Sequence, residues 1–363
     1  MKIVWIMPSK RIGGGVRVIF EYGNRLTDLG HEVIHIAPFE QFPYPLNWFK
    51  RLELKLREKI YYKLKLGKTK PFESKPSWFP LKAKLIEVPD LSAKYIPDAD
   101  IVIATAWDTV EWVNTYPASK GSKFYFVQHY ETWAGPKKRV DQTYKLAFKK
   151  ITIASWLTKK MEEFGEKVYA TINNGINLKQ FYNNNKKYNG PRRIGMLYHG
   201  AEWKGIKDGL EAFSIAQKKF PQVTLVMFGV KKEERKVPIP DFVEFYQNPP
   251  QDKIRDIYSS LDIFLSPSWT EGFGLPAMEA MACKCAVVST DTGGINDFTI
   301  AGKTALISPP RNPEALAKNL VALLENEEKL KQFSEAGFEH IKNFSWDRAA
   351  KKLEETLKNN YRR

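Results

Sequence analysis

A glycine-rich turn flanked by two glutamates offers the clearest chemistry in the sequence. Gly272 and Gly274 lie between a predicted strand and a predicted helix, where bare backbone N–H groups and the helix N-terminus attract an anion such as a diphosphate. Glu271 precedes this helix, and Glu279 follows eight residues later, near the end of its second turn. At that spacing one carboxylate would reach a reacting sugar while the other accepts hydrogen bonds from a ribose. Taken singly, Glu271 is also typical of a helix start and Glu279 of a solvated charge.

A second glycine turn, Gly13-Gly14-Gly15, joins the first predicted strand to the first predicted helix. It offers a site for a phosphate or a sugar hydroxyl, or else a tight turn without a ligand. Val18 stands where the dinucleotide fingerprint G-x-G-x-x-G needs its third glycine, which argues against a nicotinamide-dependent oxidoreductase. Asp297 stands where a P-loop ending at residues 302–304 needs its first glycine, and this excludes that motif too.

The elements that position these turns alternate between strand and helix in the first half of the chain. A helix is predicted at residues 16–29, and the pattern predicts strands at 2–7, 32–37, 100–104, 123–129 and 151–154. This alternation indicates a parallel sheet covered by helices on both faces. Between residues 39 and 89 it is replaced by Pro, Lys and aromatic residues, and we expect an insertion at the sheet edge there.

The second half repeats the alternation after a polar linker at residues 183–193. Strands are predicted at 194–199, 224–228, 242–246, 263–266 and 286–289, with a helix between the first two. Three further helices are predicted at 313–326, 328–342 and 346–359. The sequence therefore predicts two similar α/β halves.

Length and composition fit a soluble chain of two domains. Of its 363 residues, 43% are hydrophobic and 27% charged, and every apolar run is shorter than the ~20 residues of a membrane span. The apolar run 3–7 leads into Lys10 and Arg11, which indicates a strand and not a signal peptide. Cys283 and Cys285 are separated by one residue, which suits neither a disulfide framework nor a zinc site. We expect a cytoplasmic protein.

The net charge of +16 predicts attraction to an anionic partner. Residues 50–70 contain nine Lys or Arg and two Glu, a local net charge of +7. Apolar residues form one helical stripe through this segment: Phe49, Leu52, Leu56, Ile60 and Leu64. Residues 48–70 are therefore candidates for an anionic membrane surface, which would place the protein at the inner face of the plasma membrane. An ordinary insertion helix with solvated charges is the alternative.

Residues 266–282 resemble the E-x7-E signature of the retaining glycosyltransferase family 4, whose members have the GT-B fold. The resemblance covers most of the chain apart from residues 39–89. Further similar features occur in the family's order: Leu26, Gly30, His31 and Val33 of an L-x-x-x-G-H-x-V pattern, Asn174-Gly175-Ile176 with Phe181, Lys204-Gly205, Gly293-Gly294, and Phe344-Ser345-Trp346.

The resemblance implies an α/β fold of two Rossmann-like, doubly wound domains that face each other across a cleft. Residues 1–175 would form the acceptor domain, with the basic insertion at about 39–93. Residues 176–345 would form the nucleotide-sugar donor domain. Residues 346–363 would form a C-terminal helix that returns to the N-terminal domain.

The resemblance also implies roles for individual residues. His129 and Glu271 would be catalytic and orient the donor sugar. The donor-binding residues would be Gly14, Gly15, Lys204, Gly272, Phe273, Gly274, Leu275 and Glu279. Lys204 and the 274–275 amides would neutralise the diphosphate and Glu279 would hold the ribose, while the acceptor would enter beside Gly14 and Gly15. We expect no metal and no further cofactor, because the sequence lacks a clear D-x-D pair and backbone dipoles with a lysine can replace a divalent ion.

Some positions depart from the family pattern. Residues 199–204 lack the arginine of its usual G-R pair, so one phosphate contact is unassigned. Asn177 replaces an aspartate, while Lys284 and Asp297 stand where glycine and glutamate are common. Residues 125–133 resemble the rhamnosyltransferase branch.

The sequence thus predicts a retaining, metal-independent glycosyltransferase of the hexosyltransferase type. It would move a sugar from a nucleoside diphosphate sugar to a glycan or lipid-linked acceptor in polysaccharide or glycoconjugate biosynthesis. A nucleotide-sugar epimerase on the same fold is the alternative among enzymes. A basic nucleic-acid-binding protein would explain the charge but leaves the glycine and glutamate block without a purpose, so nucleic acid is not an expected partner.

Overall fold

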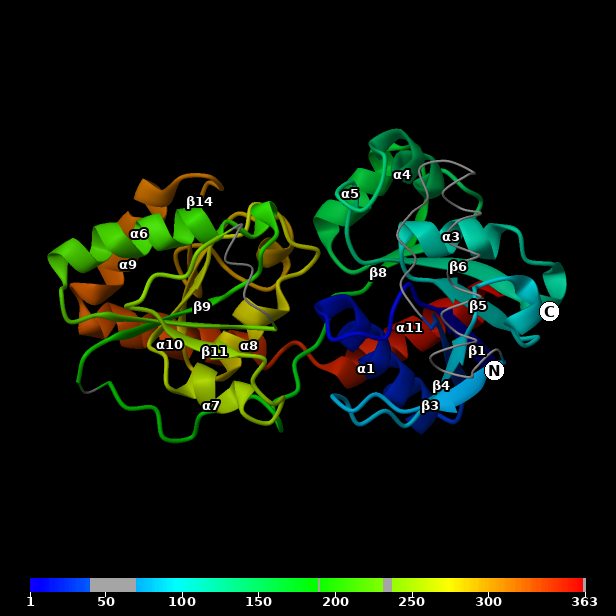
Figure 1. Ribbon diagram of the computed structural model, residues 1–363, viewed down its shortest axis with the longest axis horizontal. Coiled ribbons are helices and arrows are strands. Elements are labelled where there is room, and N and C mark those ends of the chain that lie inside the picture. Colours follow the sequence, from blue (N-terminus) through cyan, green and yellow to red (C-terminus); the bar gives the residue numbers. More distant parts are fainter. Residues whose placement is uncertain (40–69, 189, 231–236, 362–363) are drawn as a thin grey trace. The chain divides into compact units, whose positions relative to one another are not determined.

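The computed structural model describes residues 1–39, 70–188, 190–230 and 237–361, which form two compact units (Figure 1). Unit 1 consists of Met1–Ile153, Leu157–Ile172 and Ala350–Arg363. Unit 2 consists of Ala154–Trp156 and Asn173–Ala349. The candidate membrane segment 48–70 lies, apart from its last residue, outside the described residues.

The described strands of unit 1 form one sheet in the order β3-β4-β2-β1-β5-β6-β7-β8. All neighbours are parallel except β3 and β4, which are antiparallel. The strands are β1 (Lys2–Ile6), β2 (Glu32–Pro38), β3 (Phe72–Ser74), β4 (Lys84–Val88), β5 (Ile101–Ala104), β6 (Ser122–Val127), β7 (Lys149–Thr152) and β8 (Val168–Thr171). The helices between them are α1 (Gly14–Asp28), α3 (Trp107–Asn114), α4 (Lys137–Tyr144) and α5 (Ser155–Glu163).

The central strand β1 is apolar and buried from residue 3 to residue 6, because both faces of the sheet are covered there. Trp5 of β1 is fully buried and packs against Tyr22 of α1 and Phe126 of β6, with ring centroids 6.4 Å and 5.5 Å away. Since β1, β5 and β6 run parallel, their carboxyl ends meet at one edge of the sheet. The 13–15 turn and His129 both follow strands at that edge.

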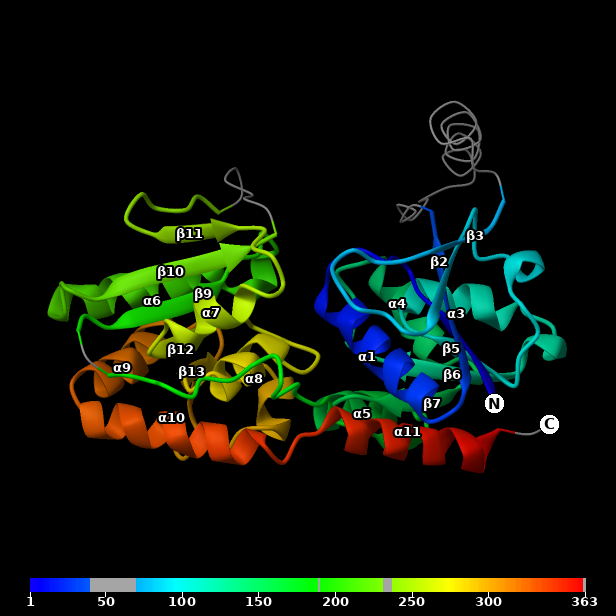
Figure 2. The ribbon, with the colours of Figure 1, turned by 90° about the horizontal axis from the view of Figure 1, so that it is seen from below.

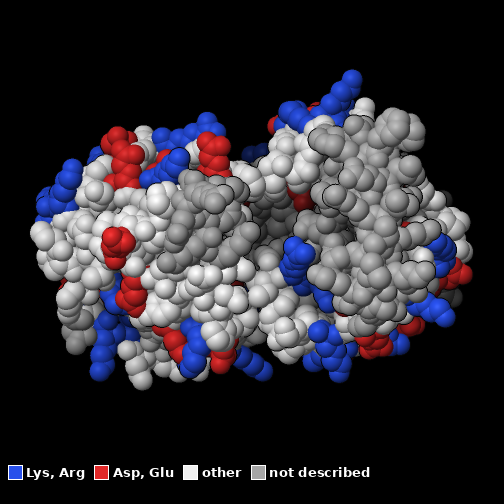
Figure 3. All heavy atoms as spheres, viewed as in Figure 1, with Lys and Arg blue, Asp and Glu red and all other residues white. Residues whose placement is uncertain are grey.

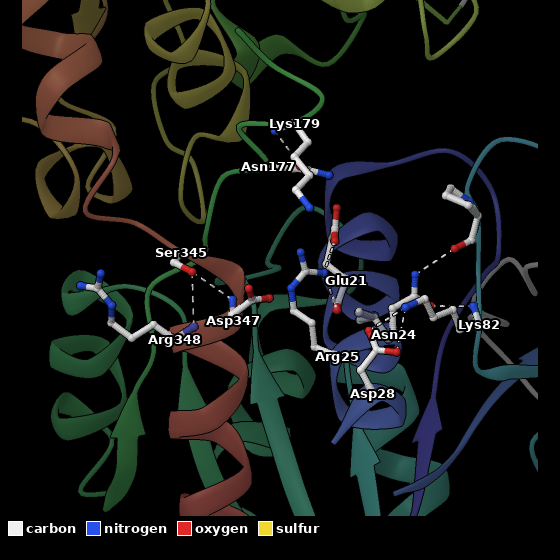
Figure 4. A network of polar contacts seen from close by, with 12 residues as sticks. Glu21, Asn24, Arg25, Asp28, Lys82, Asn177, Lys179, Ser345, Asp347 and Arg348 are labelled. Carbon is white, nitrogen blue, oxygen red and sulfur yellow. Dashed lines mark hydrogen bonds and ion pairs between the residues drawn. The ribbon is translucent and has the colours of Figure 1, made fainter. Parts of the chain in front are cut away.

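Helix α1 is also fixed by the chain that precedes β4 (Figure 4). The Asn24 side chain donates to the Pro80 carbonyl at 2.8 Å and accepts from the Lys82 amide at 2.7 Å. Lys82 Nζ then donates to both carboxylate oxygens of Asp28 at 2.7 Å. These bonds tie the C-terminal half of α1 to a segment 54 to 58 residues away.

The described strands of unit 2 form an all-parallel sheet in the order β11-β10-β9-β12-β13-β14. They are β9 (Arg193–Leu197), β10 (Thr224–Gly229), β11 (Glu244–Gln247), β12 (Ile263–Ser266), β13 (Ala286–Thr290) and β14 (Ala305–Ser308). The helices are α6 (Ile206–Lys219), α7 (Ile254–Ser259), α8 (Leu275–Ala282), α9 (Pro313–Leu324) and α10 (Glu327–Ile341). Strands β9 and β12 are neighbours, so the loops that follow them lie side by side.

Local signals explain where the last helices of unit 2 begin. The Asn312 side chain accepts from the Ala315 amide at 2.9 Å and starts α9, with Pro313 as its first residue. Asn326 accepts from the Lys329 amide at 2.9 Å and starts α10 in the same way. Both helices bury apolar residues in the core of unit 2.

The C-terminal helix α11 (Trp346–Asn360) starts in unit 2 and continues in unit 1 from Ala350 (Figure 2). Glu354 Oε1 lies 2.7 Å from His31 Nε2, at the start of β2. Lys352 Nζ donates to the Thr171 carbonyl of β8 at 2.7 Å. These contacts confirm the prediction that the C-terminal helix returns to the N-terminal domain.

The prediction of two halves with largely parallel sheets is confirmed, but four strands were missed. Residues 39–89 were expected to form an insertion at the sheet edge. In the described part of this range β3 and β4 are the outermost strands at that edge, and β4 pairs in parallel with β2. Lys84 and Glu87 interrupt its apolar pattern, and the basic composition before it dominates the segment. Strands β8 and β14 were also not predicted.

Candidate active site

The glycine turn predicted to bind an anion leads from β12 into α8. Gly274 is the N-cap of α8 and has φ of +108°, a left-handed conformation that strains any residue with a side chain. No side chain caps this helix, and Pro276 in its first turn has no N–H. Phe273 is buried and packs on Phe298 with ring centroids 5.1 Å apart, which anchors the turn. The backbone around Leu275 therefore forms a helix N-terminus suited to an anion.

Lys204 and Glu271, predicted separately, form one ion pair. Lys204 Nζ donates to Glu271 Oε1 at 2.7 Å and to Oε2 at 2.9 Å, and Ser268 Oγ donates to Oε1 at 2.7 Å. The Trp269 amide donates to the Trp203 carbonyl at 2.7 Å, which holds the two loops together. Both partners of the ion pair remain partly exposed. The site thus places a lysine and a carboxylate side by side next to the glycine turn.

Glu279 is buried, at 7% exposure, on the inner side of α8. Its Oε2 accepts a hydrogen bond of 3.0 Å from the Tyr258 hydroxyl. The alternative interpretation of Glu279 as a solvated charge is therefore wrong. Sequence reasoning missed Tyr258, which lies 21 residues before Glu279 and on another helix.

The glycine turn is packed against a second glycine turn and a tryptophan, and the sequence did not single out that tryptophan or the serine before it. Trp156 Nε1 donates to the Gly272 carbonyl at 3.1 Å. The Gly293-Gly294 turn packs so closely here that a Cβ on Gly294 would lie 2.6 Å from the Gly272 oxygen. Asp297 accepts from the Ser155 amide at 2.6 Å, which fixes Trp156 beside the turn. The only sequence signal for Ser155 and Trp156 was their position just after a predicted strand.

In unit 1, the candidates Gly14 and Gly15 open α1 and His129 follows β6. A Cβ on Gly14 would meet nothing within 4 Å, so internal packing does not require glycine there. A Cβ on Gly15 would lie 3.4 Å from the Gln128 side chain, next to His129. His129 Nδ1 accepts from the Tyr130 amide at 2.8 Å, and its ring meets Trp133 edge-on at 4.3 Å between centroids.

A carboxyl group that the sequence did not suggest lies two residues beyond His129. Glu131 Oε2 accepts from the Trp107 amide at 2.8 Å, at the start of α3. Burial raises the pKa of Glu131 to about 8, against the lowering effect of that hydrogen bond. Burial also raises the pKa of the neighbouring Asp108 to about 6. Unit 1 therefore holds two acidic groups that take up protons near neutral pH.

Within the described ranges, no cluster of three or more His, Cys, Asp or Glu residues is arranged to hold a metal ion. No helix in the described part of the chain is long and apolar enough to cross a bilayer. Cys283 and Cys285 are both buried free thiols.

Solved structures establish the fold. The Anabaena protein HepE, crystallised with UDP and glucose, aligns with 99% of this chain and 100% of its own, with a TM-score of 0.74 and 15% identity. Sucrose-phosphate synthase from Thermosynechococcus elongatus aligns with 99% of this chain and 98% of its own, with a TM-score of 0.71 and 18% identity. The chain has the GT-B fold, an α/β fold with two Rossmann-like parallel sheets.

Sequence comparisons relate part of this chain to glycosyltransferases. Residues 179–340 match the family model of glycosyl transferases group 1. A D-inositol 3-phosphate glycosyltransferase of Corynebacterium diphtheriae is 35% identical over 112 residues, which are 31% of this chain and 26% of the relative. This chain therefore spans only about a quarter of that relative's length. The family match includes Lys204, Glu271 and Glu279, while Gly14, Gly15 and His129 lie outside it.

Proposed function

We propose that the protein is a retaining, metal-independent glycosyltransferase that uses a nucleoside diphosphate sugar. The observation that carries the proposal is in unit 2, where the Lys204–Glu271 pair, the 272–275 turn and buried Glu279 occur together. All of them lie in the segment similar to group 1 glycosyl transferases. The crystal structure of HepE with UDP and glucose supports a nucleotide-sugar donor.

In the proposed donor complex, the diphosphate meets the 274–275 amides at the start of α8 and the Lys204 ammonium. These positive groups stabilise the negative charge that develops on the leaving diphosphate. Lys204 then shares its charge between Glu271 and the phosphate, while Ser268 still donates to Glu271. Glu271 accepts a hydrogen bond from the donor sugar, and Glu279 accepts from the ribose.

The proposed transfer takes place on one face of the sugar. The bond between the anomeric carbon and the diphosphate oxygen breaks, and the acceptor oxygen bonds to that carbon on the same face. The acceptor's proton passes to the departing phosphate oxygen, so no separate base is needed. His129 would contact the donor sugar, and the acceptor would enter beside Gly14 and Gly15.

The finer assignments are also proposals. Residues 1–175 would bind the acceptor, residues 176–345 the donor, and residues 346–363 would complete the N-terminal domain. The acceptor would be a glycan or lipid-linked glycan, met on the cytoplasmic side of the plasma membrane. The relatives named D-inositol 3-phosphate glycosyltransferases support an acceptor that offers a hydroxyl group to the sugar. The likeness of residues 125–133 to rhamnosyltransferases suggests rhamnose as the sugar.

Proton NMR of the first-formed product tests this proposal. Donors carrying UDP, GDP, ADP or dTDP are supplied with glycan acceptors, and we expect transfer with the donor's anomeric configuration retained. EDTA should leave the rate essentially unchanged. An inverted anomeric signal, or a covalent glycosyl adduct in the intact mass, would contradict the same-face mechanism. A free nucleotide sugar with an inverted ring carbon would instead identify an epimerase.

A further inference from the structure

The Tyr258 hydroxyl bonds directly to the carboxylate proposed to hold the ribose. Its oxygen lies 3.0 Å from Glu279 Oε2, and the tyrosine is 1% exposed. A carboxylate only accepts hydrogen bonds, so the tyrosine is the donor. The pair links α7, which carries Tyr258, to α8, which carries Glu279.

The position of this hydroxyl is fixed by the core and does not depend on a ligand. The Tyr258 ring packs edge-on against Phe228 and Phe264, with centroids 5.3 Å and 5.5 Å away. Its backbone carbonyl accepts from Cys285 Sγ at 3.1 Å. Because the ring is enclosed and the backbone is held, the hydroxyl keeps one place relative to α8.

A fixed donor has two effects on a buried carboxylate. It offsets part of the cost of burying the charge of Glu279, and it selects one orientation of the carboxylate. A single hydroxyl occupies only one of about four acceptor positions on a carboxylate, so bonds to a ribose remain compatible with it. A site built to bond a hydroxyl also discriminates against a ligand that lacks it, because a buried polar group then loses its partner.

We propose that Tyr258 is a positioning residue that, through Glu279, makes the site selective for ribonucleoside diphosphates over their 2′-deoxy counterparts. The inference rests on the proposed function, since it requires Glu279 to face the ribose. It assigns the donor to the ribonucleotide class and excludes thymidine diphosphate sugars, the 2′-deoxy class.

Isothermal titration of the full chain with matched nucleotide pairs tests the inference. The probes are UDP, GDP and ADP, each with its 2′-deoxy form, and dTDP. We expect the wild-type protein to bind the preferred ribonucleotide roughly ten-fold or more tightly than its deoxy form. Tyr258→Phe keeps the packed ring and removes the hydroxyl, and it should reduce that ratio to about three-fold or less. Loss of the ratio at an unchanged melting temperature separates positioning from a general effect on stability.

Tyr198→Phe is the matched control in the same unit. Tyr198 is equally buried, and its hydroxyl donates to the Val237 carbonyl at 2.8 Å instead of to Glu279. This variant should keep the wild-type ratio. The wild-type measurement needs no variant, so equal binding of the ribose and deoxyribose forms would overturn the inference even if Tyr258→Phe does not fold.

The outcomes separate this inference from the proposed function. Equal wild-type binding of ribose and deoxyribose forms, preferred binding of dTDP, or an unchanged ratio in folded Tyr258→Phe would overturn the role of Tyr258. Each of those results would still leave a nucleotide-binding enzyme. Failure of every nucleotide to bind would contradict the proposed function itself, and the inference with it.

Discussion

Lys204 and Glu271 are 67 residues apart in the chain and form one ion pair in unit 2. Both side chains are partly exposed, and an ion pair of that kind contributes only about 0–1 kcal/mol to stability. The ion pair therefore matters for where it places the two side chains and contributes little to the stability of the fold. The pair keeps a lysine next to the glycine turn and a carboxylate aligned by Ser268 before any ligand arrives.

A double-mutant cycle tests whether the pair acts as one unit in turnover. Lys204→Ala and Glu271→Gln should each lower kcat by roughly ten-fold or more, because each removes one partner. The double variant should be scarcely slower than the worse single variant. Lys331→Ala serves as a control, since it breaks the exposed Lys331–Glu327 pair of α10. If the reduction in kcat of the double variant equals the product of the two single reductions, the two residues do not cooperate.

The loop between β9 and α6 depends on a glycine, Gly205, for its course. Gly205 has φ of +62°, and a Cβ there would lie 2.0 Å from the Pro267 carbonyl oxygen. Any other residue would push the Lys204 loop away from the strand that leads to Glu271. Since the lysine sits directly before Gly205, a change here acts on both stability and the site.

Gly205→Ala should lower the free energy of unfolding by more than its conformational cost of about 1–2 kcal/mol, because backbone must also move. Gly302→Ala is the matched control. Gly302 has φ of +74°, but a Cβ there would meet nothing within 4 Å, so only the conformational cost applies. Urea titration compares the two variants. Equal destabilisation would mean that the contact with Pro267 is easily relieved.

Glu131, whose carboxyl group accepts a hydrogen bond at the start of α3, makes the stability of the fold depend on pH. Its pKa is about 8 in the folded protein against an ordinary value of 4.5, so the folded state holds a proton that the unfolded state has lost. Stability should therefore fall as the pH rises from about 5 to 8. Glu131→Gln keeps an oxygen that accepts from Trp107 and should reduce this fall, with a remainder from Asp108.

Melting temperatures measured from pH 5 to 8 check the expectation for Glu131. Glu162→Gln, a change at an exposed position of α5, should leave the wild-type slope intact. The same slope in Glu131→Gln as in the wild type would show that this carboxyl titrates normally.

The sequence alone predicted those features whose signal lies within one short segment. It did not predict contacts that depend on which strands are neighbours in the sheet. Strand β12, the glycine turn and Glu279 lie in one short segment, so their order and spacing were readable. The Lys204–Glu271 pair depends on β9 and β12 being adjacent, and Trp156 reaches Gly272 across 116 residues. Strand β8 was missed because its residues are all half-buried, as at a sheet edge, and carry no clear pattern.

The two units differ in how they resemble known proteins. The family match at residues 179–340 lies within unit 2, while the structural matches extend over 98–99% of the chain. The matched family model therefore lies outside unit 1, to which the structural matches extend.

The charge of the chain does not by itself favour nucleic acid. On the face shown in Figure 3, basic and acidic side chains of the described residues are interspersed and do not form one continuous basic stripe. A nucleic-acid-binding surface typically gathers its lysines and arginines on one face. The net charge of +16 includes the basic segment 50–70, nearly all of which lies outside the described residues.

Calorimetric titration with nucleoside diphosphates, and separately with random DNA, tests whether unit 2 binds a nucleotide. We predict saturable binding of one nucleotide per chain with Kd below about 1 mM, weakened roughly ten- to hundred-fold by Glu279→Ala as charge-assisted bonds are lost. DNA should bind weakly and lose affinity steeply with salt. Tight DNA binding with no saturable binding of UDP, GDP, ADP or dTDP would contradict the account.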